Sequence, residues 1–286
     1  MKGISKNDRG YLKIFLIILL FAILSGCNGT NPVINSFFAS PSAIIAGDST
    51  TLSWTVTDAD SVTIDYGIGT VALTGITTVN PTTDTTYTLI TTNSTGPVIA
   101  TVTVTVAPIE TLTLQPGSEG KDAYVMDIFS EDNFGDIIFL SVGVFTVPFA
   151  RSYLQFDLSP LPSEVVILDA SLGLYYDSPY NLFSLPIGLY EVAENWVENT
   201  LTWNNQPASS NEAVDIQIIL ASQTNDFVYW YIADLVKGWH EGSISNYGIV
   251  LRDTDESSDN GGVEFFSSDW LTANQRPKLI IDFYVP

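Results

Sequence analysis

Apolar and polar residues alternate with a period of two along most of the chain after residue 31. Between residues 31 and 107 the polar positions are mostly threonine in four runs, at 49–56, 61–66, 85–91 and 99–106, and a further run lies at 34–39. A period of two places alternate side chains on opposite faces of a strand, so these runs predict strands with one buried face. Turn residues separate the runs, which is typical of a small β-sandwich of about seven strands.

The pattern changes after Pro108 and Ile109, where threonine runs give way to acidic loops and aromatic residues. Residues 232–239 predict a short helix that stops near Gly242. The predicted strands of this part cover residues 111–114, 137–142, 151–157, 167–176, 185–192, 227–231, 248–252, 263–267 and 277–283. About nine strands joined by long loops favour a jelly-roll β-sandwich.

The first 26 residues have the layout of a leader peptide. Basic residues precede the uncharged apolar run 14–24, which is long enough for a signal peptide and too short to span a bilayer. Residues 24–27, Leu-Ser-Gly-Cys, resemble the lipobox of bacterial lipoproteins, and Cys27 is the single cysteine of the chain. The resemblance implies cleavage after residue 26, lipidation of Cys27 and a short linker over residues 27–31. An ordinary secretory signal with a chance cysteine is the alternative.

The charge of the chain excludes one class of function. The part after the leader has six basic and thirty-one acidic residues, a net charge near −25. Such a chain repels nucleic acid, so no nucleic-acid partner is expected. The implied location is the cell envelope, in the outer membrane or at the cell surface, with the lipid anchor as the membrane partner.

Residues 32–107 resemble the immunoglobulin-like modules of exported bacterial proteins. The similarity is carried by 38–42, 47–54, 61–65, 69–71 and 85–89, and these modules usually act as spacers. Trp54 and Tyr87 lie where such folds bury an aromatic residue. We therefore predict that both belong to the core.

Residues 110–286 resemble the DNRLRE-type domains, which are classed with carbohydrate-binding module family 96. The motifs that carry this resemblance lie at residues 122–125, 133–135, 151–162, 167–175, 195–207, 236–239, 246–252, 265–268 and 276–279. The literal string that names the family is absent. Together the patterns and resemblances predict an all-β protein, with an immunoglobulin-like β-sandwich at 32–107 and a larger jelly-roll-like one at 110–286.

The residues do not indicate catalysis. The chain has one histidine, His240, and neither a nucleophile-elbow serine nor a phosphate loop. Many carboxylates are present, but no spacing marks two of them as a glycosidase pair. We expect no enzyme activity and no required cofactor.

Sugar binding needs aromatic rings, because the C–H faces of sugars stack on them. The candidate carbohydrate-binding residues are Trp270, Trp230, Tyr229, Tyr231 and Trp239. Alternation places Trp230 on the face opposite Tyr229 and Tyr231, so one of these two faces is core. Trp270 lies in a predicted loop and is the best candidate for an exposed ring.

An acidic loop is the candidate metal site. Calcium takes six to eight oxygen ligands, and this loop offers Asp253, Asp255, Glu256, Asp259 and Asn260. A structural calcium ion is one interpretation. A solvated acidic hairpin is the other, since the spacing does not match an EF-hand.

Three functions follow from these observations. The first is a non-catalytic, surface-anchored lipoprotein that presents a carbohydrate-binding β-sandwich on an immunoglobulin-like spacer. The second is a structural or adhesive lipoprotein without a sugar site, and the third is a polysaccharide-degrading enzyme. The family resemblance implies an acidic polysaccharide such as alginate, which this acidic chain could hold only through calcium or through local cations. Among the few cations available are Arg151, Arg252, Arg276 and Lys278.

Overall fold

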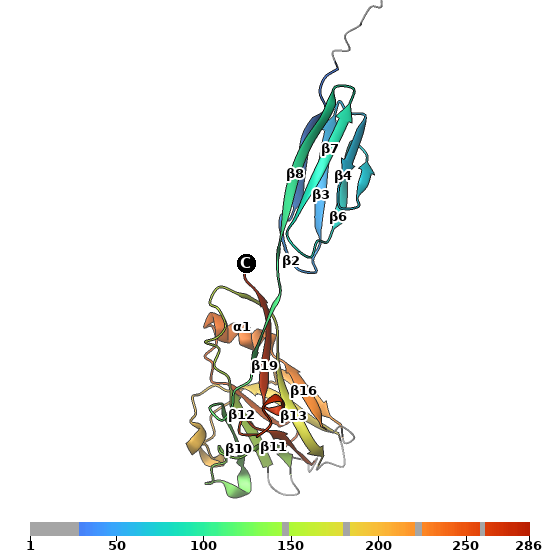
Figure 1. The fold of residues 1–286 in the computed structure, drawn as a ribbon. Coiled ribbons are helices and arrows are strands. Elements are labelled where there is room, and N and C mark those ends of the chain that lie inside the picture. The colour runs from blue at the N-terminus through green and yellow to red at the C-terminus, as the bar shows by residue number, and fades with distance from the viewer. Residues whose placement is uncertain (1–28, 145–148, 180–183, 221–224, 258–260) are drawn as a thin grey trace, which may run out of the picture. The chain divides into compact units, whose positions relative to one another are not determined.

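The computed structural model describes residues 29–144, 149–179, 184–220, 225–257 and 261–286, which form an almost entirely β-stranded protein (Figure 1). The predicted all-β class is confirmed. Within these residues, the helices are one α-helix and four short 3-10 helices. None of the described helices is long and apolar enough to cross a membrane. Cys27 and the leader lie outside the described residues.

Residues 33–107 form two sheets. The first has the order β1-β3-β6, with β1 at Val33–Ser40, β3 at Thr50–Thr57 and β6 at Thr74–Val79. The second has the order β2-β8-β7-β4-β5, with β2 at Ala43–Ile45, β8 at Gly96–Ala107, β7 at Thr85–Asn93, β4 at Ser61–Ile64 and β5 at Gly69–Val71. All five strands predicted for this part are present. Trp54 and Tyr87 are both 4% exposed, as predicted for core residues.

Residues 110–284 form an eleven-stranded sheet. Nine of its strands follow the order β15-β14-β17-β12-β11-β18-β13-β19-β9. The other two, β10 and β16, lie outside this order and pair with β12 and β13. Because β12 and β13 exchange partners along their lengths, the sheet has two layers. The strand bounds are β9 Glu110–Leu114, β10 Lys121–Met126, β11 Phe139–Val144, β12 Phe149–Gln155, β13 Val166–Pro179, β14 Leu185–Glu191, β15 Asp215–Ile219, β16 Asp226–Tyr231, β17 Ile249–Asp253, β18 Gly262–Phe266 and β19 Lys278–Tyr284.

The nine strands predicted for this part all occur, and β10 and β15 are additional. The sequence pattern missed β10 because its residues do not alternate between apolar and polar. It missed β15 because this short strand exposes Ile216 and Ile218. The predicted helix is α1, Ala233–Glu241, and Gly242 ends it in a left-handed conformation with φ 74°.

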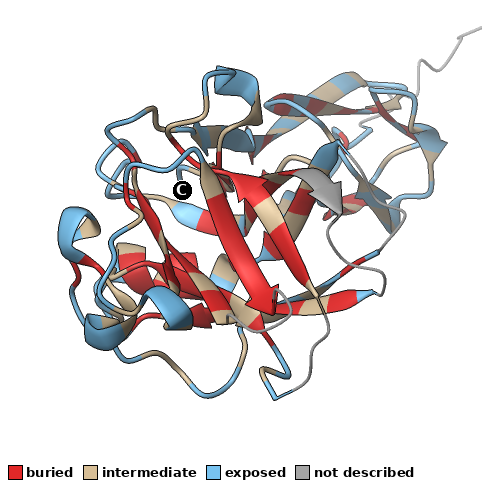
Figure 2. Cartoon of the chain, turned by 90° about the horizontal axis from the view of Figure 1, so that it is seen from below, coloured by how far each residue is buried: buried red, intermediate tan, exposed pale blue. Residues whose placement is uncertain are grey.

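Two apolar clusters lie on the sheet, and Figure 2 shows the buried residues along its strands. The larger one fills the space between the layers and includes Trp230, Phe265 and Tyr176. The smaller one lies on the outer face of β10, β12, β14 and β17, and includes Tyr153, Tyr190 and Trp196. It contacts the loop segment between β14 and β15, which contributes Trp196, Leu201 and Trp203. This loop therefore covers part of the outer face and borders the surface that carries Arg151 and Arg252.

Candidate functional site

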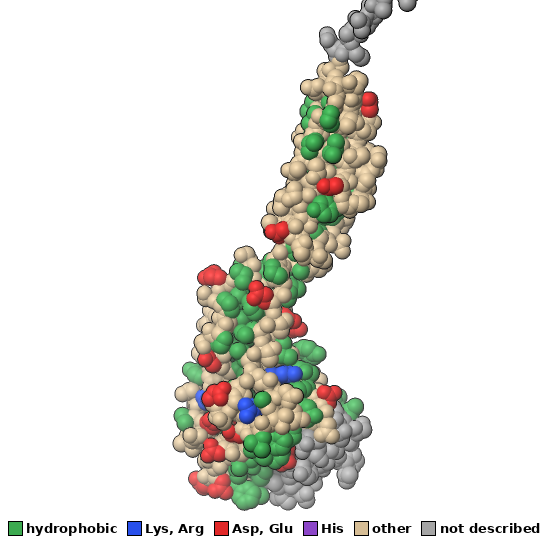
Figure 3. Space-filling view, viewed as in Figure 1, with side chains coloured by type: hydrophobic (Ala, Val, Ile, Leu, Met, Phe, Trp, Pro, Cys, Tyr) green, Lys and Arg blue, Asp and Glu red, His purple; other side chains and the backbone are tan. Residues whose placement is uncertain are grey.

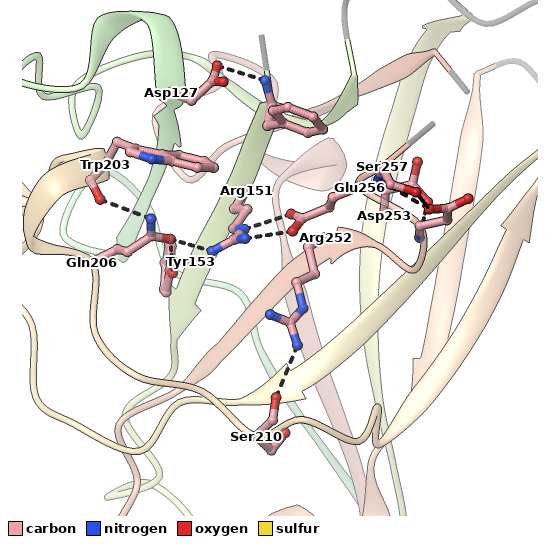
Figure 4. Close-up of polar contacts among 12 residues, drawn as sticks. Asp127, Arg151, Tyr153, Trp203, Gln206, Ser210, Arg252, Asp253, Glu256 and Ser257 are labelled. Atoms are coloured by element: carbon pink, nitrogen blue, oxygen red, sulfur yellow. Dashed lines mark hydrogen bonds and ion pairs between the residues drawn. The ribbon is translucent and has the colours of Figure 1, made fainter. Parts of the chain in front are cut away.

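Two arginines lie side by side on the outer face of β12 and β17. These strands pair with Ser152 opposite Leu251 and Tyr153 opposite Val250, so Arg151 and Arg252 extend from neighbouring positions on the same face. We call this surface the arginine face, and Figure 4 shows its polar contacts. Its residues are Arg151, Tyr153, Tyr190, Trp203, Gln206, Arg252 and Glu256.

Arg151 is held by a carboxylate, an amide and an aromatic ring. Its Nε and Nη2 donate to the two carboxylate oxygens of Glu256 at 2.7 and 2.6 Å, and its Nη1 donates to Gln206 Oε1 at 2.8 Å. The guanidinium carbon lies 4.8 Å from the centroid of the Trp203 ring. Burial would lower the pKa of Arg151, but the Glu256 carboxylate outweighs it and the pKa is raised. The side chains of Arg151 and Glu256 remain 22% and 27% exposed, so solvent reaches the pair.

Arg252 is held more loosely. Its guanidinium stacks on the Tyr190 ring, with its carbon 3.9 Å from the ring centroid, and Nη2 donates to the Ser210 carbonyl at 3.1 Å. This is the one hydrogen bond that its guanidinium makes with the described residues. Figure 4 shows its side chain directed away from the Arg151–Glu256 pair. Arg252 thus retains N–H donors for a ligand, and Arg is suited to binding planar carboxylates through two such donors.

Tyr153 fixes the base of the arginine face. Its hydroxyl donates to Gln206 Oε1 at 3.0 Å, the same oxygen that Arg151 contacts. Burial raises the pKa of Tyr153 to about 12. Tyr153 therefore stays protonated at physiological pH and keeps Gln206 in place as a hydrogen-bond partner.

The predicted aromatic residues divide between the core and a second surface. Trp230 is fully buried, and its Nε1 donates to the Ile187 carbonyl at 3.0 Å. Trp239 is 8% exposed. The prediction that these two residues bind sugar is therefore wrong, because a ring without an accessible face cannot stack on a sugar. Alternation placed Trp230 opposite Tyr229 and Tyr231 as predicted, and the face of Trp230 is the core.

The second surface, here called the aromatic face, is formed by Phe139, Tyr175, Phe227, Tyr229, Phe266 and Trp270. Trp270 stacks on Phe266 with ring centroids 3.7 Å apart and an interplanar angle of 5°. Lys278 Nζ lies 3.6 Å from the centroid of the Phe227 ring. Much of the stacking surface of these rings is therefore already in contact with neighbouring rings or with Lys278. Tyr231, at the end of β16, is 60% exposed and has a free ring surface.

Each described carboxylate of the acidic loop has a hydrogen-bond partner within the protein. Glu256 binds Arg151, the Asp255 carboxylate accepts the backbone N–H of Ser257, and Asp253 is buried and accepts the N–H of Asp255. Asp259 lies outside the described residues, as does Asn260. Among the described residues, no three His, Cys, Asp or Glu side chains are grouped as metal ligands.

A buried carboxylate lies at the start of β10 and is not one of the predicted site residues. Asp122 is 3% exposed, its Oδ2 accepts the backbone N–H of Ser268 at 2.9 Å, and its Oδ1 has no hydrogen-bond partner among the described residues. Burial raises its pKa to about 7, and the nearby carboxylates of Glu198 and Asp269 contribute. Asp122 is thus partly protonated at neutral pH.

A groove of about 760 Å³ runs beside β9 and the ends of β10 and β12. Lys121 lies in its wall, and its Nζ donates to Gln155 Oε1 and lies 4.3 Å from the centroid of the Trp196 ring. Burial lowers the pKa of Lys121. Because this cation is already engaged, and Glu119 and Asp157 also line the groove, it is a poorer site for an acidic ligand than the arginine face.

The family model of carbohydrate-binding module family 96 matches residues 113–283, which is more than half of the chain. The chain belongs to this family. The arginine face and the aromatic face both lie within the family 96 domain. A comparison with curated proteins found no significant match.

Two of the solved structures that match this chain cover most of its length. One is a carbohydrate-binding module of the β-sandwich superfamily with promiscuous specificity, 13% identical over 90% of this chain and 97% of that one, with a TM-score of 0.23. Another is SGBP-B from a complex xyloglucan utilization locus in Bacteroides uniformis, 12% identical over 84% and 72% of the two chains, with a TM-score of 0.24. The TM-scores are too low for these neighbours to indicate a ligand for this chain.

Sequence reasoning named Arg151 and Arg252 as available cations but did not pair them, and it assigned no role to Tyr190 or Gln206. The signal that could have joined the arginines is that Arg151 begins the predicted strand 151–157 and Arg252 ends the predicted strand 248–252, so antiparallel pairing of these strands would place them opposite each other. That signal is incomplete, because pairing of β12 with β17 across about a hundred residues is a tertiary fact.

Proposed function

We propose that the protein is an exported, lipid-anchored protein of the cell envelope that binds a glycan and does not catalyse its cleavage. Membership of a carbohydrate-binding family supports the glycan. The leader and the motif that ends at Cys27 support export and anchoring. Residues 32–107 then serve as an immunoglobulin-like spacer between the anchor and the family 96 domain.

We further propose that the glycan binds at the arginine face and that Arg252 holds a carboxylate of an acidic sugar. The observation that carries this proposal is the spare hydrogen-bonding capacity of Arg252, whose guanidinium stacks on Tyr190 and donates to the Ser210 carbonyl. A carboxylate can take two of the remaining N–H donors in one plane. The half-buried Trp203 ring beside Arg151 offers an apolar surface for a neighbouring sugar.

The charge distribution supports the same surface. All six basic residues of the part after the leader lie in the family 96 domain, and two of them are adjacent on this face. Figure 3 shows how few Lys and Arg side chains appear among the Asp and Glu side chains on the visible face of the molecule. In so acidic a protein, two neighbouring arginines with aromatic partners mark the surface best suited to an anionic ligand.

The test is calorimetric titration of the chain from residue 28 to 286 with oligosaccharides that carry glucuronic acid. Arg252→Gln should weaken binding at least tenfold, because it removes a charge-assisted hydrogen bond. Lys237→Gln is the control, since it removes the same charge from the solvent-facing side of helix α1, where Lys237 contacts Asp234. Equal affinities of both variants and the unmodified protein would overturn the proposed site.

Tyr231→Ala separates this site from the exposed ring at the end of β16. We expect it to leave affinity within twofold, because Tyr231 extends from β16, a strand that pairs with β13 and not with β12 or β17. A large loss of glycan affinity in this variant would instead indicate that the sugar binds at Tyr229, Tyr231 and Trp270. Failure of every glycan to bind would instead favour the structural or adhesive function, and release of new reducing ends from a polysaccharide would favour the enzyme.

A further inference from the structure

Two buried oxygen atoms near the start of β10 have no hydrogen-bond partner among the described residues. They are Asp122 Oδ1 and Ser268 Oγ, and their residues are 3% and 0% exposed. Burial raises the pKa of Asp122 and the nearby Ser268 hydroxyl partly offsets this effect, but these two atoms do not hydrogen-bond to each other. Buried polar atoms nearly always have a partner, so this pair points to a water molecule or an ion beside both oxygens.

A second carboxylate reaches the same place from the loop segment between β14 and β15. Glu198 Oε1 accepts the backbone N–H of Asp122 at 3.0 Å, the one hydrogen bond that the Glu198 side chain makes with the described residues. Its other oxygen, Oε2, is therefore available to a ligand. Asp269 follows Ser268 directly and adds a third negative charge. Burial raises the pKa values of Asp122 and Glu198, and the charge of Asp269 raises both further.

Backbone contacts hold these three segments together. The Ser268 N–H donates to Asp122 Oδ2 at 2.9 Å, across 146 residues of sequence, and Asn133 Nδ2 donates to the Glu198 carbonyl at 2.6 Å. Gly120 approaches Ser268 so closely that a Cβ would lie 2.7 Å from the serine Cβ. The oxygen atoms are thus positioned by the fold before any ligand binds, which lowers the entropy cost of binding.

The chain supplies no direct countercharge to these carboxylates. Among the described residues, neither Asp122 nor Glu198 forms an ion pair with a Lys or Arg, and Lys121 donates to Gln155 instead. A buried carboxylate without a partner destabilises the fold, whereas a bound divalent cation reverses the sign of that effect. Carboxylate and hydroxyl oxygens suit Ca²⁺, which accepts six to eight ligands in flexible geometry, whereas Mg²⁺ requires a near-ideal octahedron.

We propose that Asp122 Oδ1, Glu198 Oε2 and Ser268 Oγ bind a calcium ion, with water and backbone oxygens as its remaining ligands. The protein ligands are two carboxylates and a hydroxyl, so the site needs no group of three acidic side chains. The ion joins β10 and the turn after β18 to the loop segment between β14 and β15. That segment carries Trp203 of the arginine face, so calcium stabilises one side of this surface.

Terbium luminescence tests the site directly, because Tb³⁺ replaces Ca²⁺ at oxygen ligands and emits when a nearby tryptophan is excited. Trp196 and Trp270 each lie two positions from a proposed ligand, Glu198 and Ser268. The chain from residue 28 to 286 is freed of metal with EDTA, desalted and titrated with Tb³⁺. We expect saturable luminescence that Ca²⁺ displaces and Na⁺ of matched ionic strength does not. Absence of this signal in the parent protein would overturn the proposal.

Three substitutions test the ligands: Asp122→Asn, Glu198→Gln and Ser268→Ala. Each of the two carboxylate variants should weaken Tb³⁺ binding at least about tenfold, and Ser268→Ala should weaken it less, because a charged ligand contributes more than a neutral one. Asp255→Asn is the control, since it removes a carboxylate from the acidic loop before β18. Parent-like affinity in Asp122→Asn and Glu198→Gln would overturn the site. Loss of binding in Asp255→Asn alone would place the ion at the acidic loop and also overturn it.

Melting temperatures separate loss of binding from loss of folding. In EDTA at about pH 8, Asp122→Asn should melt no lower than the parent, because it lacks a buried charge whose pKa in the metal-free protein is about 7. Millimolar Ca²⁺ should raise the melting temperature of the parent more than sodium chloride of matched ionic strength does, and should not do so for Asp122→Asn. Equal shifts in the parent would mean that water or a proton satisfies the buried oxygens, against the proposal. No glycan enters these tests, so their outcome is independent of the proposed function.

Discussion

Replacing the buried Asp122 by asparagine should change how stability depends on pH. The folded state raises the pKa of Asp122 from 3.8 to about 7 because the carboxylate is buried. Between these two values the folded protein binds more protons than the unfolded chain. Stability from this group is therefore present at about pH 4 and is lost as the pH rises through about 7.

The magnitude follows from the size of the change in pKa. A pKa difference of this size corresponds to roughly 4 kcal/mol between acidic and alkaline limits. The asparagine side chain cannot ionise and avoids this cost. The hydrogen bond from the Ser268 N–H to the carboxylate is already part of the folded-state pKa, so it is not subtracted again. We therefore expect Asp122→Asn to be nearly equal to the parent near pH 4 and about 3–4 kcal/mol more stable than the parent above pH 8.

The assay is urea unfolding of the chain from residue 28 to 286, followed by tryptophan fluorescence at pH values from 4 to 9. Burial also raises the pKa values of Glu198 and Asp269, so the variant should keep part of the slope. Asp234→Asn, which alters an exposed carboxylate on α1, should follow the parent at every pH. Parallel curves for Asp122→Asn and the parent would refute the reasoning, since they would mean that Asp122 titrates alike in both states.

Four further predictions concern the core, a turn, the anchor and calcium. Trp230→Ala should destabilise the family 96 domain by about 3–5 kcal/mol in the same unfolding assay, because it empties the centre of the core and removes the hydrogen bond from the Trp230 Nε1 to the Ile187 carbonyl. Gly248→Ala should cost roughly 2 kcal/mol or more, because φ is +85° and a Cβ would lie 2.1 Å from the Leu154 carbonyl oxygen; an unchanged unfolding midpoint would contradict it. An inhibitor of lipoprotein signal peptidase should cause the full-length precursor to accumulate, and Cys27→Ala should leave the membrane fraction, whereas membrane retention of that variant would disprove lipidation. If the acidic loop binds calcium, millimolar calcium should raise the melting temperature more than sodium chloride of matched ionic strength does, and Asp255→Asn should remove the excess; equal shifts would indicate screening alone.

The sequence by itself determined the class of the fold and most of its strands. Strict alternation shows directly which residues face the core, so Trp54, Tyr87 and the strands from 151 to 283 could be predicted from local pattern. Gly242 marked the end of the helix because a left-handed terminus favours glycine. The leader motif and the net charge can also be read from the sequence without tertiary information.

Only the tertiary structure decided which aromatic and charged residues meet. Local pattern placed Trp230 and Tyr229 on opposite faces, but the packing of the two layers decided that the face of Trp230 is the core. Local pattern also did not show that Glu256 contacts Arg151, because that ion pair depends on the pairing of β12 with β17. Contacts between residues about a hundred positions apart depend on strand order, and strand order is set by the packing of the whole sheet and not by the pattern of any one strand.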